Sequence, residues 1–329
     1  MQSARLDLAL QSGVWLLPPV GDIAVYRPRA GDDLRALPKD RVVVLTGFKP
    51  DQDHFAALGY RTTITAPPVS ALICLPRAKD AAFALIAEAA AHLPIGALIA
   101  IDGQKTDGID AVVKACRGLG LTVGEVLAKA HGKFAVVQTD PRLGLWRAMA
   151  KPVADGFWTA PGVFSADGPD RGSQALAACL PRDLGGSIAD LGAGWGYLAR
   201  EILTRPGVKH LDLVEAEQDA LDCARRNVTD SRAAFHWADA TTFRPVRPWN
   251  AVVMNPPFHT LRAADPGLGQ AFLRAAHRGL APNGSLWLVA NLHLPYDKLL
   301  HALFGDVQTL SVDGGFRVSR ASYPVRAKR

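Results

Sequence analysis

Short apolar runs alternate with helical patterns along the second half of the chain. Such runs are typical of buried strands and occur at 187–190, 211–215, 251–254 and 285–290. Apolar residues with helical spacing lie between them, for example at 198–203 and 270–280. This alternation predicts a mostly parallel α/β sheet. Apolar residues on both sides of Asp313-Gly314-Gly315 predict two more strands within 307–323, joined as an antiparallel hairpin.

The first half of the chain repeats part of this plan. The stretch AFALIAEAAAHLPIGALIAID (82–102) resembles AFLRAAHRGLAPNGSLWLVAN (271–291), although generic alternation of helices and strands can also produce such a match. Further helical patterns follow at 109–119 and at 296–304. We therefore predict an α/β fold of two tandem Rossmann-like domains, each a mostly parallel sheet with a C-terminal antiparallel hairpin. Prolines and glycines between 138 and 160 favour a division into domains 1–150 and 151–329.

The length of 329 residues is sufficient for two domains that each bury a core. Hydrophobic residues make up 49% and charged residues 21%, a composition that favours neither a disordered nor a fibrous chain. The longest apolar region, 81–101, is interrupted by Glu88, His92, Pro94 and Gly96, so it does not predict a membrane span. The start, MQSARLDLAL, lacks the pattern of a signal peptide, and we expect a cytoplasmic protein.

The charge and the cysteine content limit the partners and cofactors that we expect for this chain. The formal charge is +6 and the isoelectric point is near 9.2, with three more basic than acidic residues in each half. This surplus modestly favours a polyanionic partner. The cysteines are too widely spaced for a zinc or redox pair, so we expect reduced, buried thiols and no metal site. These cysteines are Cys74, Cys116, Cys179 and Cys223.

A glycine-rich segment, ADLGAGWGYLA (189–199), follows the first of the predicted strands and opens a helix. At such a position the backbone can approach a ligand closely. A dinucleotide fingerprint would place its third glycine at position 197, which is Tyr197, so the spacing fits a methyl donor better. The residues expected to leave room for the amino-acid tail of that donor are Gly192, Ala193, Gly194 and Gly196.

Acidic residues follow the predicted strands beside this loop. Asp190 lies at a strand end, where it can engage the loop and the amino group of the donor. Glu215 ends the next strand and can accept hydrogen bonds from both ribose hydroxyls. Asp239, with Ala240 beside it, follows another apolar stretch and can bind the adenine amino group. The alternatives are a tight turn for the glycines and solvated caps for Glu215 and Asp239.

Two prolines follow the strand predicted at 251–254, in the segment MNPPFHT. They hold φ near −65° and contribute no N–H donor, so the segment is rigid and presents acceptors. The side-chain oxygen of Asn255 and the backbone carbonyl of Pro256 can accept from the N–H groups of an exocyclic amine. They would stabilise the positive charge that grows on its nitrogen during methyl transfer. Pro257 completes the rigid pair, and Phe258 can stack on a planar substrate.

The prolines also have a simpler interpretation, because Pro-Pro often only terminates a strand. The glycine loop upstream of them strengthens the catalytic interpretation. We expect no general base, since a methylated aminium is acidic enough to lose its proton to water. His259 is accordingly interpreted as a positioning or solvent-facing residue.

Together, DLGAGWG, Glu215 and NPPF resemble the class I S-adenosylmethionine-dependent methyltransferases that modify amino groups. The chain is still more similar to the ribosomal RNA small-subunit methyltransferase C family and its large-subunit relative, which methylate guanine N2. This closer resemblance rests on WTAPGVFSADGPDRGSQAL (158–176), NPPFH (255–259) and LVANLHLPYDKLL (288–300). NPPF-type motifs also occur in adenine and protein glutamine methyltransferases.

The resemblance implies S-adenosylmethionine as the methyl donor and a guanine N2 amine of ribosomal RNA as the acceptor, with 16S rRNA of the small ribosomal subunit as the first candidate. It also implies tandem methyltransferase-like domains, of which a degenerate first copy supports folding and RNA binding. Phe164 and Ser173 would lie near the donor or the target base, unless their segment is only a surface loop that caps the helix starting near Gly172. We expect a monomer that binds no membrane.

Two features of the first half agree with a degenerate copy. Leu75-Pro76-Arg77 stands where Asn255-Pro256-Pro257 would be expected, and it has neither an amide nor a stacking ring. The stretch VVVLTGFKP (42–50) contains a single glycine, Gly47, where a donor loop needs several. Trp195 departs from the family pattern, since it is a bulky residue inside the glycine loop.

Two other functions stay open at this point. A protein glutamine N5-methyltransferase would use the same NPPF-type motif, but it would carry a small accessory domain rather than a degenerate twin. A non-catalytic RNA-binding ribosome assembly factor would need neither Asn255 nor a complete glycine loop.

Overall fold

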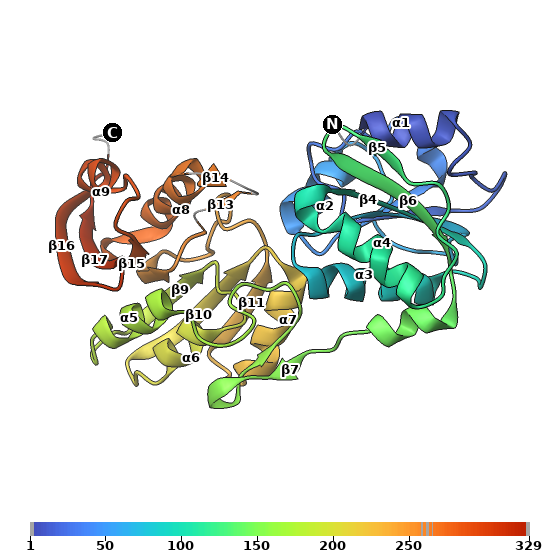
Figure 1. The fold of residues 1–329 in the computed structure, drawn as a ribbon. Coiled ribbons are helices and arrows are strands. Elements are labelled where there is room, and N and C mark those ends of the chain that lie inside the picture. Colours follow the sequence, from blue (N-terminus) through green and yellow to red (C-terminus); the bar gives the residue numbers. More distant parts are fainter. Residues whose placement is uncertain (1–2, 258, 261–262, 265, 327–329) are drawn as a thin grey trace. The chain divides into compact units, whose positions relative to one another are not determined.

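The computed structural model describes residues 3–257, 259–260, 263–264 and 266–326. The chain divides into two compact units, Met1–Met149 (unit 1) and Ala150–Arg329 (unit 2). Each unit is built on a mixed sheet with helices packed on both faces (Figure 1). In each, the parallel strands are followed by an antiparallel hairpin, so the predicted fold class is confirmed.

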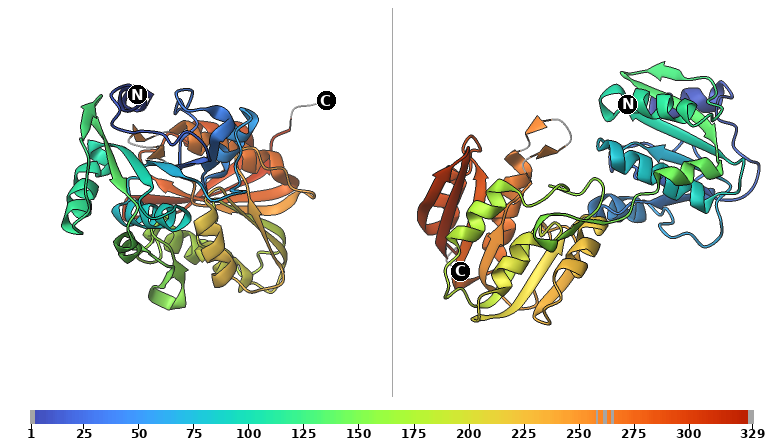
Figure 2. Two further views of the ribbon diagram at one scale, coloured as in Figure 1. Left: turned by 90° about the vertical axis from the view of Figure 1, so that its right-hand side faces the viewer. Right: turned by 60° about the horizontal axis from the view of Figure 1, so that its bottom comes forward.

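The sheet of unit 2 places its parallel strands at one side and a hairpin at the other (Figure 2, hairpin in red). Its spatial order is β11 (Ala233–Trp237), β10 (Val208–Glu215), β9 (Gly186–Leu191), β12 (Trp249–Met254), β15 (Leu280–Asn291), β17 (Phe316–Pro324) and β16 (Phe304–Asp313). Strands β11 to β15 are parallel, and β17 is antiparallel to both its neighbours. Gly314 and Gly315 form the hairpin turn at φ of +55° and +86°, as the sequence predicts.

Both faces of this sheet are covered by helices (Figure 1). One face carries α5 (Arg171–Cys179), α6 (Tyr197–Leu203) and α7 (Gln218–Asn227), and the other carries α8 (Pro266–Gly279) and α9 (Asp297–Leu303). Successive residues of a strand point to opposite faces. Ile188 and Val253 therefore enter the first core, whereas Ala189 and Val252 enter the second. Burial on both faces explains why these strands are almost continuously apolar. Two short strand pairs complete the unit: β7 (Lys151–Pro152) with β8 (Trp158–Thr159), and β13 (His259–Thr260) with β14 (Ala263–Ala264).

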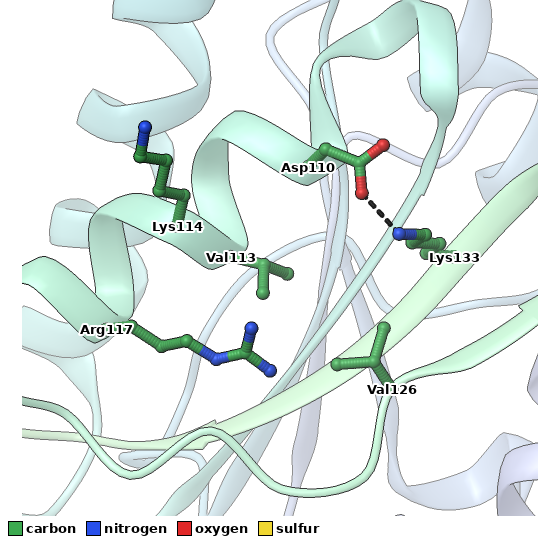
Figure 3. Close-up of a pocket in the computed structure, with 6 residues that line it drawn as sticks. All are labelled: Asp110, Val113, Lys114, Arg117, Val126 and Lys133. Carbon is green, nitrogen blue, oxygen red and sulfur yellow. Dashed lines mark hydrogen bonds and ion pairs between the residues drawn. The ribbon is translucent and has the colours of Figure 1, made fainter.

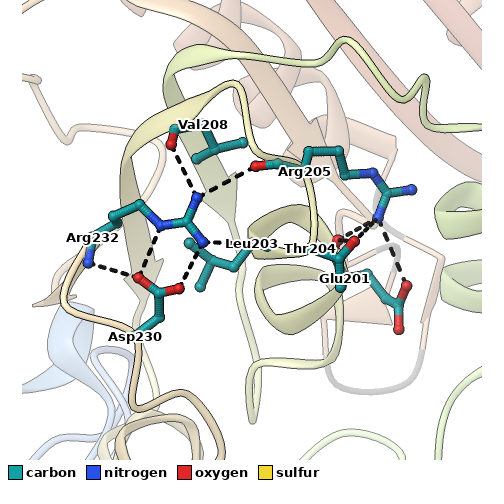
Figure 4. Close-up of polar contacts among 7 residues, drawn as sticks. All are labelled: Glu201, Leu203, Thr204, Arg205, Val208, Asp230 and Arg232. Atoms are coloured by element: carbon teal, nitrogen blue, oxygen red, sulfur yellow. Dashed lines mark hydrogen bonds and ion pairs between the residues drawn. The ribbon is translucent and has the colours of Figure 1, made fainter.

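Arg232 connects the start of β11 to the turn between α6 and β10 (Figure 4). Its guanidinium donates to the carbonyl oxygens of Leu203 at 2.6 Å and Val208 at 3.0 Å. The carboxylate of Asp230 holds the same group in a bidentate pair, at 2.9 and 2.6 Å. Carbonyls at the end of a helix have no partner within the helix. Arg232 supplies a hydrogen-bond donor for such a carbonyl. It thereby fixes the start of β10, which carries Glu215, and the start of β11, which leads to Asp239.

Unit 1 repeats the strand order of unit 2. Its order is β2 (Val42–Leu45), β1 (Ile23–Tyr26), β3 (Ser70–Cys74), β4 (Leu98–Gln104), β6 (Gly132–Gln138) and β5 (Leu127–Lys129). Within residues 3–149 the place of β11 is taken by no full strand, and Arg61 forms an isolated parallel bridge there with Val43 of β2. Helices α3 (Lys79–His92) and α4 (Ile109–Gly118) cover one face together with the 3₁₀ helix η3 (Pro141–Trp146). Helices α1 (Ser3–Gln11) and α2 (Lys49–Ala57) cover the other.

The strand order corrects one comparison between the halves. Strand β1 occupies the place of β9 and β2 that of β10, so the counterpart of the donor loop is 27–31 and not 42–50. The prediction based on Gly47 was wrong about the strand, because VVVL of β2 is a stronger apolar signal than the IAVY of β1. The true counterpart reads RPRAG and has one glycine. Leu75-Pro76-Arg77 does follow β3, the counterpart of β12.

All four cysteines are free thiols. Cys74, Cys116 and Cys223 are buried as expected, whereas Cys179 ends α5 and is only partly covered. Burial raises the pKa of Cys116 and of Cys223 to about 11. In the described parts of the chain, no helix is long and apolar enough to cross a membrane. In the same residues, no group of three His, Cys, Asp or Glu side chains could hold a metal ion.

A buried ion pair attaches α1 to the sheet of unit 1. The guanidinium of Arg5 donates to both carboxylate oxygens of Asp102, at 2.5 and 3.0 Å, and each side chain is 1% exposed. Arg5 also donates to the carbonyl oxygens of Lys129 and Ala130, which lie in the β5–β6 hairpin. A Cβ at Gly132 would lie 2.5 Å from this guanidinium, so glycine is required there. Burial raises the pKa of Asp102, and the interaction with Arg5 opposes that shift.

Replacing Arg5 by alanine should lower the free energy of unfolding by about 3–5 kcal/mol, because it leaves the buried carboxylate of Asp102 without its partner. The matched control is Arg35→Ala. Arg35 pairs with Asp33 at the surface and its side chain is 87% exposed, so its loss should leave the free energy of unfolding nearly unchanged. Urea denaturation of the full chain measures both. Equal effects of the two substitutions would contradict the structural importance of the buried pair.

Candidate active site

The carboxyl ends of the parallel strands of unit 2 meet at one edge of the sheet. The register is fixed around Asp190 of β9, which pairs with Leu213 of β10 on one side and with Val253 of β12 on the other. Residues at equal distances beyond this row therefore lie at the same level of the edge. The residues two positions further along these strands are Glu215, Gly192 and Asn255.

The glycine loop turns away from β9 at this level. Gly192 donates its N–H to the carbonyl of Val214 at 2.9 Å, and Gly194 donates to a carboxylate oxygen of Glu215 at 2.8 Å. Gly192, Gly194 and Gly196 have φ of +75°, +55° and +91°, a region that side chains rarely enter. A Cβ at Gly196 would also lie 3.0 Å from Val228. The predicted glycine spacing is thus a backbone requirement of this turn.

Two carboxyl groups lie beneath the loop: Asp190, which is fully buried, and Glu215, which is partly exposed. Neither carboxylate oxygen of Asp190 has a hydrogen-bond partner among the described residues. Burial and the nearby Glu215 raise the pKa of Asp190 to about 8, and the backbone of Ala199 opposes this shift. Burial also raises the pKa of Glu215. The backbone N–H groups of Glu217 and Gly194 donate to its two carboxylate oxygens and oppose this shift. An unpartnered buried carboxyl beside a glycine turn fits the positively charged amino group of a methyl donor.

The contacts of Trp195 explain why this bulky residue stands inside the glycine loop. Its indole ring is buried and packs against Phe157, with ring centroids 4.9 Å apart. Its Nε1–H donates to the carbonyl oxygen of Phe164 at 2.9 Å. Asn227 of α7 donates to the carbonyl of Trp195 and accepts from the backbone N–H of Trp158, each at 2.7 Å. The segment that precedes α5 is therefore attached directly to the glycine loop through the backbone of Phe164, whose side chain is exposed.

Asn255 and the prolines lie next to this loop. A Cβ at Gly192 would lie 4.0 Å from Cδ of Pro257. The side-chain amide of Asn255 donates to Asp170 and to Ser173, which lie at the start of α5. The structure therefore places Ser173 beside Asn255. Asp170 also caps α5, which confirms the helix cap that the sequence offered as an alternative. Sequence reasoning missed Asp170 as a site residue, since its only local signal is that of a helix cap.

Asp239 follows β11 and lies next to Glu215 at the same edge. The N–H of Ala238 donates to the carbonyl of Glu215 at 3.0 Å. One carboxylate oxygen of Asp239 accepts from the N–H and the hydroxyl of Thr241, so the side chain stabilises the turn, and Ala240 is buried beneath it. The assignment of Asp239 to the adenine stays a prediction. Phe258 and the side chain of His259 lie outside the described residues.

The site can now be compared with known proteins. Residues 155–320 match the model of the Methyltransferase small domain family. A protein of Pseudomonas aeruginosa (strain LESB58) named "Ribosomal RNA small subunit methyltransferase C" is 32% identical over 264 residues, which cover 77% of this chain and 78% of that protein. The chain belongs to the ribosomal RNA small subunit methyltransferase C family. A relative of the same name from Cronobacter sakazakii is 29% identical over 72% of this chain and 70% of its own.

A solved structure shows the same fold. It is a T. thermophilus 16S rRNA N2 methyltransferase in complex with AdoMet and guanosine, with a TM-score of 0.78, 23% identity and coverage of 96% of this chain and 91% of that one. The family resemblance that the sequence suggested is confirmed by the relative of Pseudomonas aeruginosa and by the family model. As a member of this family, the chain is an enzyme that uses S-adenosylmethionine.

The substitution Asp190→Asn tests the buried carboxyl. The pKa is raised from 3.8 to about 8 on folding, so between these values the folded protein holds a proton that the unfolded chain has lost. This group therefore makes the stability fall as pH rises through that window, by up to about 1.4 kcal/mol per pH unit. The carboxamide of the variant cannot titrate. Urea titrations at several pH values measure the free energy of unfolding of both proteins. The value for the variant minus the value for the original protein should become more positive from pH 5 to pH 8. A constant difference would contradict the raised pKa of Asp190.

Proposed function

We propose that the chain transfers a methyl group from S-adenosylmethionine to the exocyclic N2 amine of a guanine in 16S ribosomal RNA, as a cytoplasmic monomer. The observation that carries this proposal is the position of Asn255. Its side-chain oxygen lies at the sheet edge beside the glycine loop and accepts no hydrogen bond from any described residue. The names of the relatives and the guanosine bound by the T. thermophilus enzyme support the choice of acceptor.

On the donor side, three acidic residues would act in a row along the edge. Asp190 would receive the amino group of the donor, Glu215 its ribose hydroxyls, and Asp239 its adenine amine. The donor supplies an electrophilic methyl group on a sulfonium. Glu215 already accepts two backbone N–H groups, so it would hold the loop and the ribose together, since each carboxylate oxygen has two lone pairs. The carboxyl of Asp190, which has no hydrogen-bond partner among the described residues, is the strongest sign that this edge of the sheet suits a cation.

On the acceptor side, the guanine amine is a weak nucleophile because its lone pair is delocalised into the ring. The carbonyl oxygens of Asn255 and Pro256 would accept its two N–H groups and so favour the tetrahedral, positively charged nitrogen of the transition state. Pro256 and Pro257 lack N–H donors, so neither can compete for these oxygens. The proton would then leave to water. Phe258 would stack on the base.

The two other functions are less well supported. A protein glutamine methyltransferase with a small accessory domain does not match unit 1, which repeats the strand order of the catalytic sheet. A non-catalytic assembly factor would have no use for a glycine loop with three left-handed glycines beside an oriented Asn255.

Incubation of the chain with S-adenosylmethionine and 16S rRNA or small subunits should produce N2-methylguanosine, identified by mass spectrometry of the nucleosides. Asn255→Ala should lower the single-turnover rate about 10²–10³-fold while donor affinity stays nearly unchanged. Glu215→Gln should do the reverse and raise the dissociation constant of the donor about 10–100-fold, with turnover at saturating donor within a few-fold. Methylation of adenine or of a protein glutamine instead would contradict the proposed acceptor.

A basic pocket of unit 1 offers a contact for the RNA (Figure 3). It has a volume of about 230 Å³ and is lined by Asp110, Val113, Lys114, Arg117, Val126 and Lys133. Asp110 of α4 forms an ion pair with Lys133 of β6. Lys114 and Arg117, both exposed on α4, have no hydrogen bond or ion pair to any residue that the structure describes. The guanidinium of Arg117 points toward the apolar side chains of Val113 and Val126, and the ammonium of Lys114 projects from the same helix away from them (Figure 3).

We extend the proposal to this pocket. Each of the two cations suits one phosphodiester of an RNA strand, which an arginine can hold with two parallel hydrogen bonds. The side chains of Val113 and Val126 would contact the sugar or base attached to it. Unit 1, which has no donor loop, would in this way add affinity for the RNA without taking part in the chemistry.

Replacing Lys114 and Arg117 together by glutamine should weaken RNA binding and reduce the slope of log affinity against log salt by roughly 1.5, because two phosphate contacts are lost. Donor affinity should stay unchanged. The matched control is Arg182→Gln with Lys209→Gln, which removes the same charge from exposed positions of unit 2 near the opposite, amino ends of the strands. Filter binding at several salt concentrations compares the two pairs, and equal losses would show that only net charge matters.

A further inference from the structure

The orientation of the Asn255 side chain is imposed by two residues at the start of α5, the N-cap Asp170 and Ser173. Its amide nitrogen has two N–H groups, and both are used: one donates to Oδ2 of Asp170 and the other to Oγ of Ser173, each at 2.9 Å. The amide oxygen therefore has no role within the described part of the chain and remains available as an acceptor.

Asp170 and Ser173 are themselves held in place. Asp170 is the N-cap of α5, and the same Oδ2 accepts the backbone N–H of Ser173 at 3.0 Å. Ser173 is buried, with 7% of its surface exposed. The helix start lies so close to β17 that a Cβ at Gly172 would be 3.1 Å from the ring of Phe316 and 3.0 Å from Oδ2 of Asp170. The carboxylate thus has one position, set by the packing of α5 on the sheet.

A negative charge at this position selects one of the two orientations of the amide. If the amide rotated by half a turn, its oxygen would face the carboxylate of Asp170, which is repulsive. Ser173 alone could not make this choice, because a hydroxyl both donates and accepts. Donation to a carboxylate also polarises the amide and increases the negative charge on its oxygen. Both effects favour an amide oxygen of Asn255 that is oriented and polarised as an acceptor before the reaction begins.

We propose that Asp170 is a positioning residue for methyl transfer: it orients and polarises the amide of Asn255 so that the amide oxygen faces the amine of the substrate base, and Ser173 supports it. This inference rests on the proposed function, since it concerns the acceptor that Asn255 would provide. Asp170 acts through Asn255 and touches neither substrate nor donor.

The alternative is that Asp170 only caps α5, and one substitution separates the two roles. Serine is as good an N-cap as aspartate, so Asp170→Ser retains the bond to the N–H of residue 173. Its shorter side chain and missing charge remove the contact with Asn255. The melting temperature of Asp170→Ser should shift by no more than about 3 °C. The control is Asp140→Ser, the same change at the N-cap of η3 in unit 1, which should leave methyl transfer unaltered.

Single-turnover kinetics measure the effect on the reaction. Asp170→Ser should lower the rate of methyl transfer about 10–100-fold, part of the loss expected for removing the acceptor itself. The dissociation constant of the donor should change less than about threefold. In the background of Asn255→Ala, the same substitution should cause no further loss, because Asp170 acts through the missing amide. A rate within a few-fold of the original protein, or an equal loss in both backgrounds, would overturn the proposal.

A second measurement does not depend on activity. Nitrogen-15 spectra of the full chain should contain one carboxamide pair that is absent from Asn255→Ala. Donation to a carboxylate should shift one of its proton resonances downfield, and Asp170→Ser should reverse that shift. An unchanged resonance in Asp170→Ser would overturn the positioning role. If instead Asn255→Ala retained full activity while the shift behaved as expected, the proposed function of Asn255 would fail and the orientation by Asp170 would stand.

Discussion

The candidate site depends on the parallel register of three neighbouring strands. Asp190 on β9 pairs at the same level with β10 and with β12, so these strands reach the sheet edge together. Glu215, the glycine turn and Asn255 then follow at equal heights, although they are separated widely in sequence. A shift of one residue in either pairing would turn the side chains of that strand to the opposite face. The burial of Asp190 has the same origin, because the central strand of a covered sheet has no access to water.

The loops around this edge are held by side chains rather than by regular structure. Trp195 donates to the carbonyl of Phe164, and Asn227 joins the backbone of Trp158 to that of Trp195. Asp170 connects the start of α5 to Asn255. These bonds satisfy backbone groups that the turns leave without partners, and they attach three separate segments to one another. The edge is therefore rigid where hydrogen-bond direction matters most.

Comparison of the two units shows which residues of the site are replaced in the first copy of the sheet. Unit 1 retains the strand order, but its donor-loop counterpart at 27–31 carries two arginines where unit 2 has glycines, and Leu75 replaces Asn255. At the end of β4, Asp102 is engaged in a buried ion pair with Arg5. The same architecture can thus support either a reactive edge or an internal network of charges, depending on which side chains follow the strands.

The sequence by itself determined four parallel strands of unit 2 (β9, β10, β12 and β15), three of its helices (α6, α8 and α9), the hairpin at Gly314 and Gly315, and the glycine turn. Each is specified by residues within a few positions of one another. Local patterns were also sufficient to mark Glu215 and Asn255 as strand-end residues. Only the tertiary structure decided that β1 and not β2 matches β9, since a short apolar run has no position in a sheet until its neighbours pair with it. The roles of Trp195 and Asp170 were decided in the same way: a bulky loop residue and a helix cap became anchors for segments 31 and 85 positions away, and no periodicity encodes contacts across such distances.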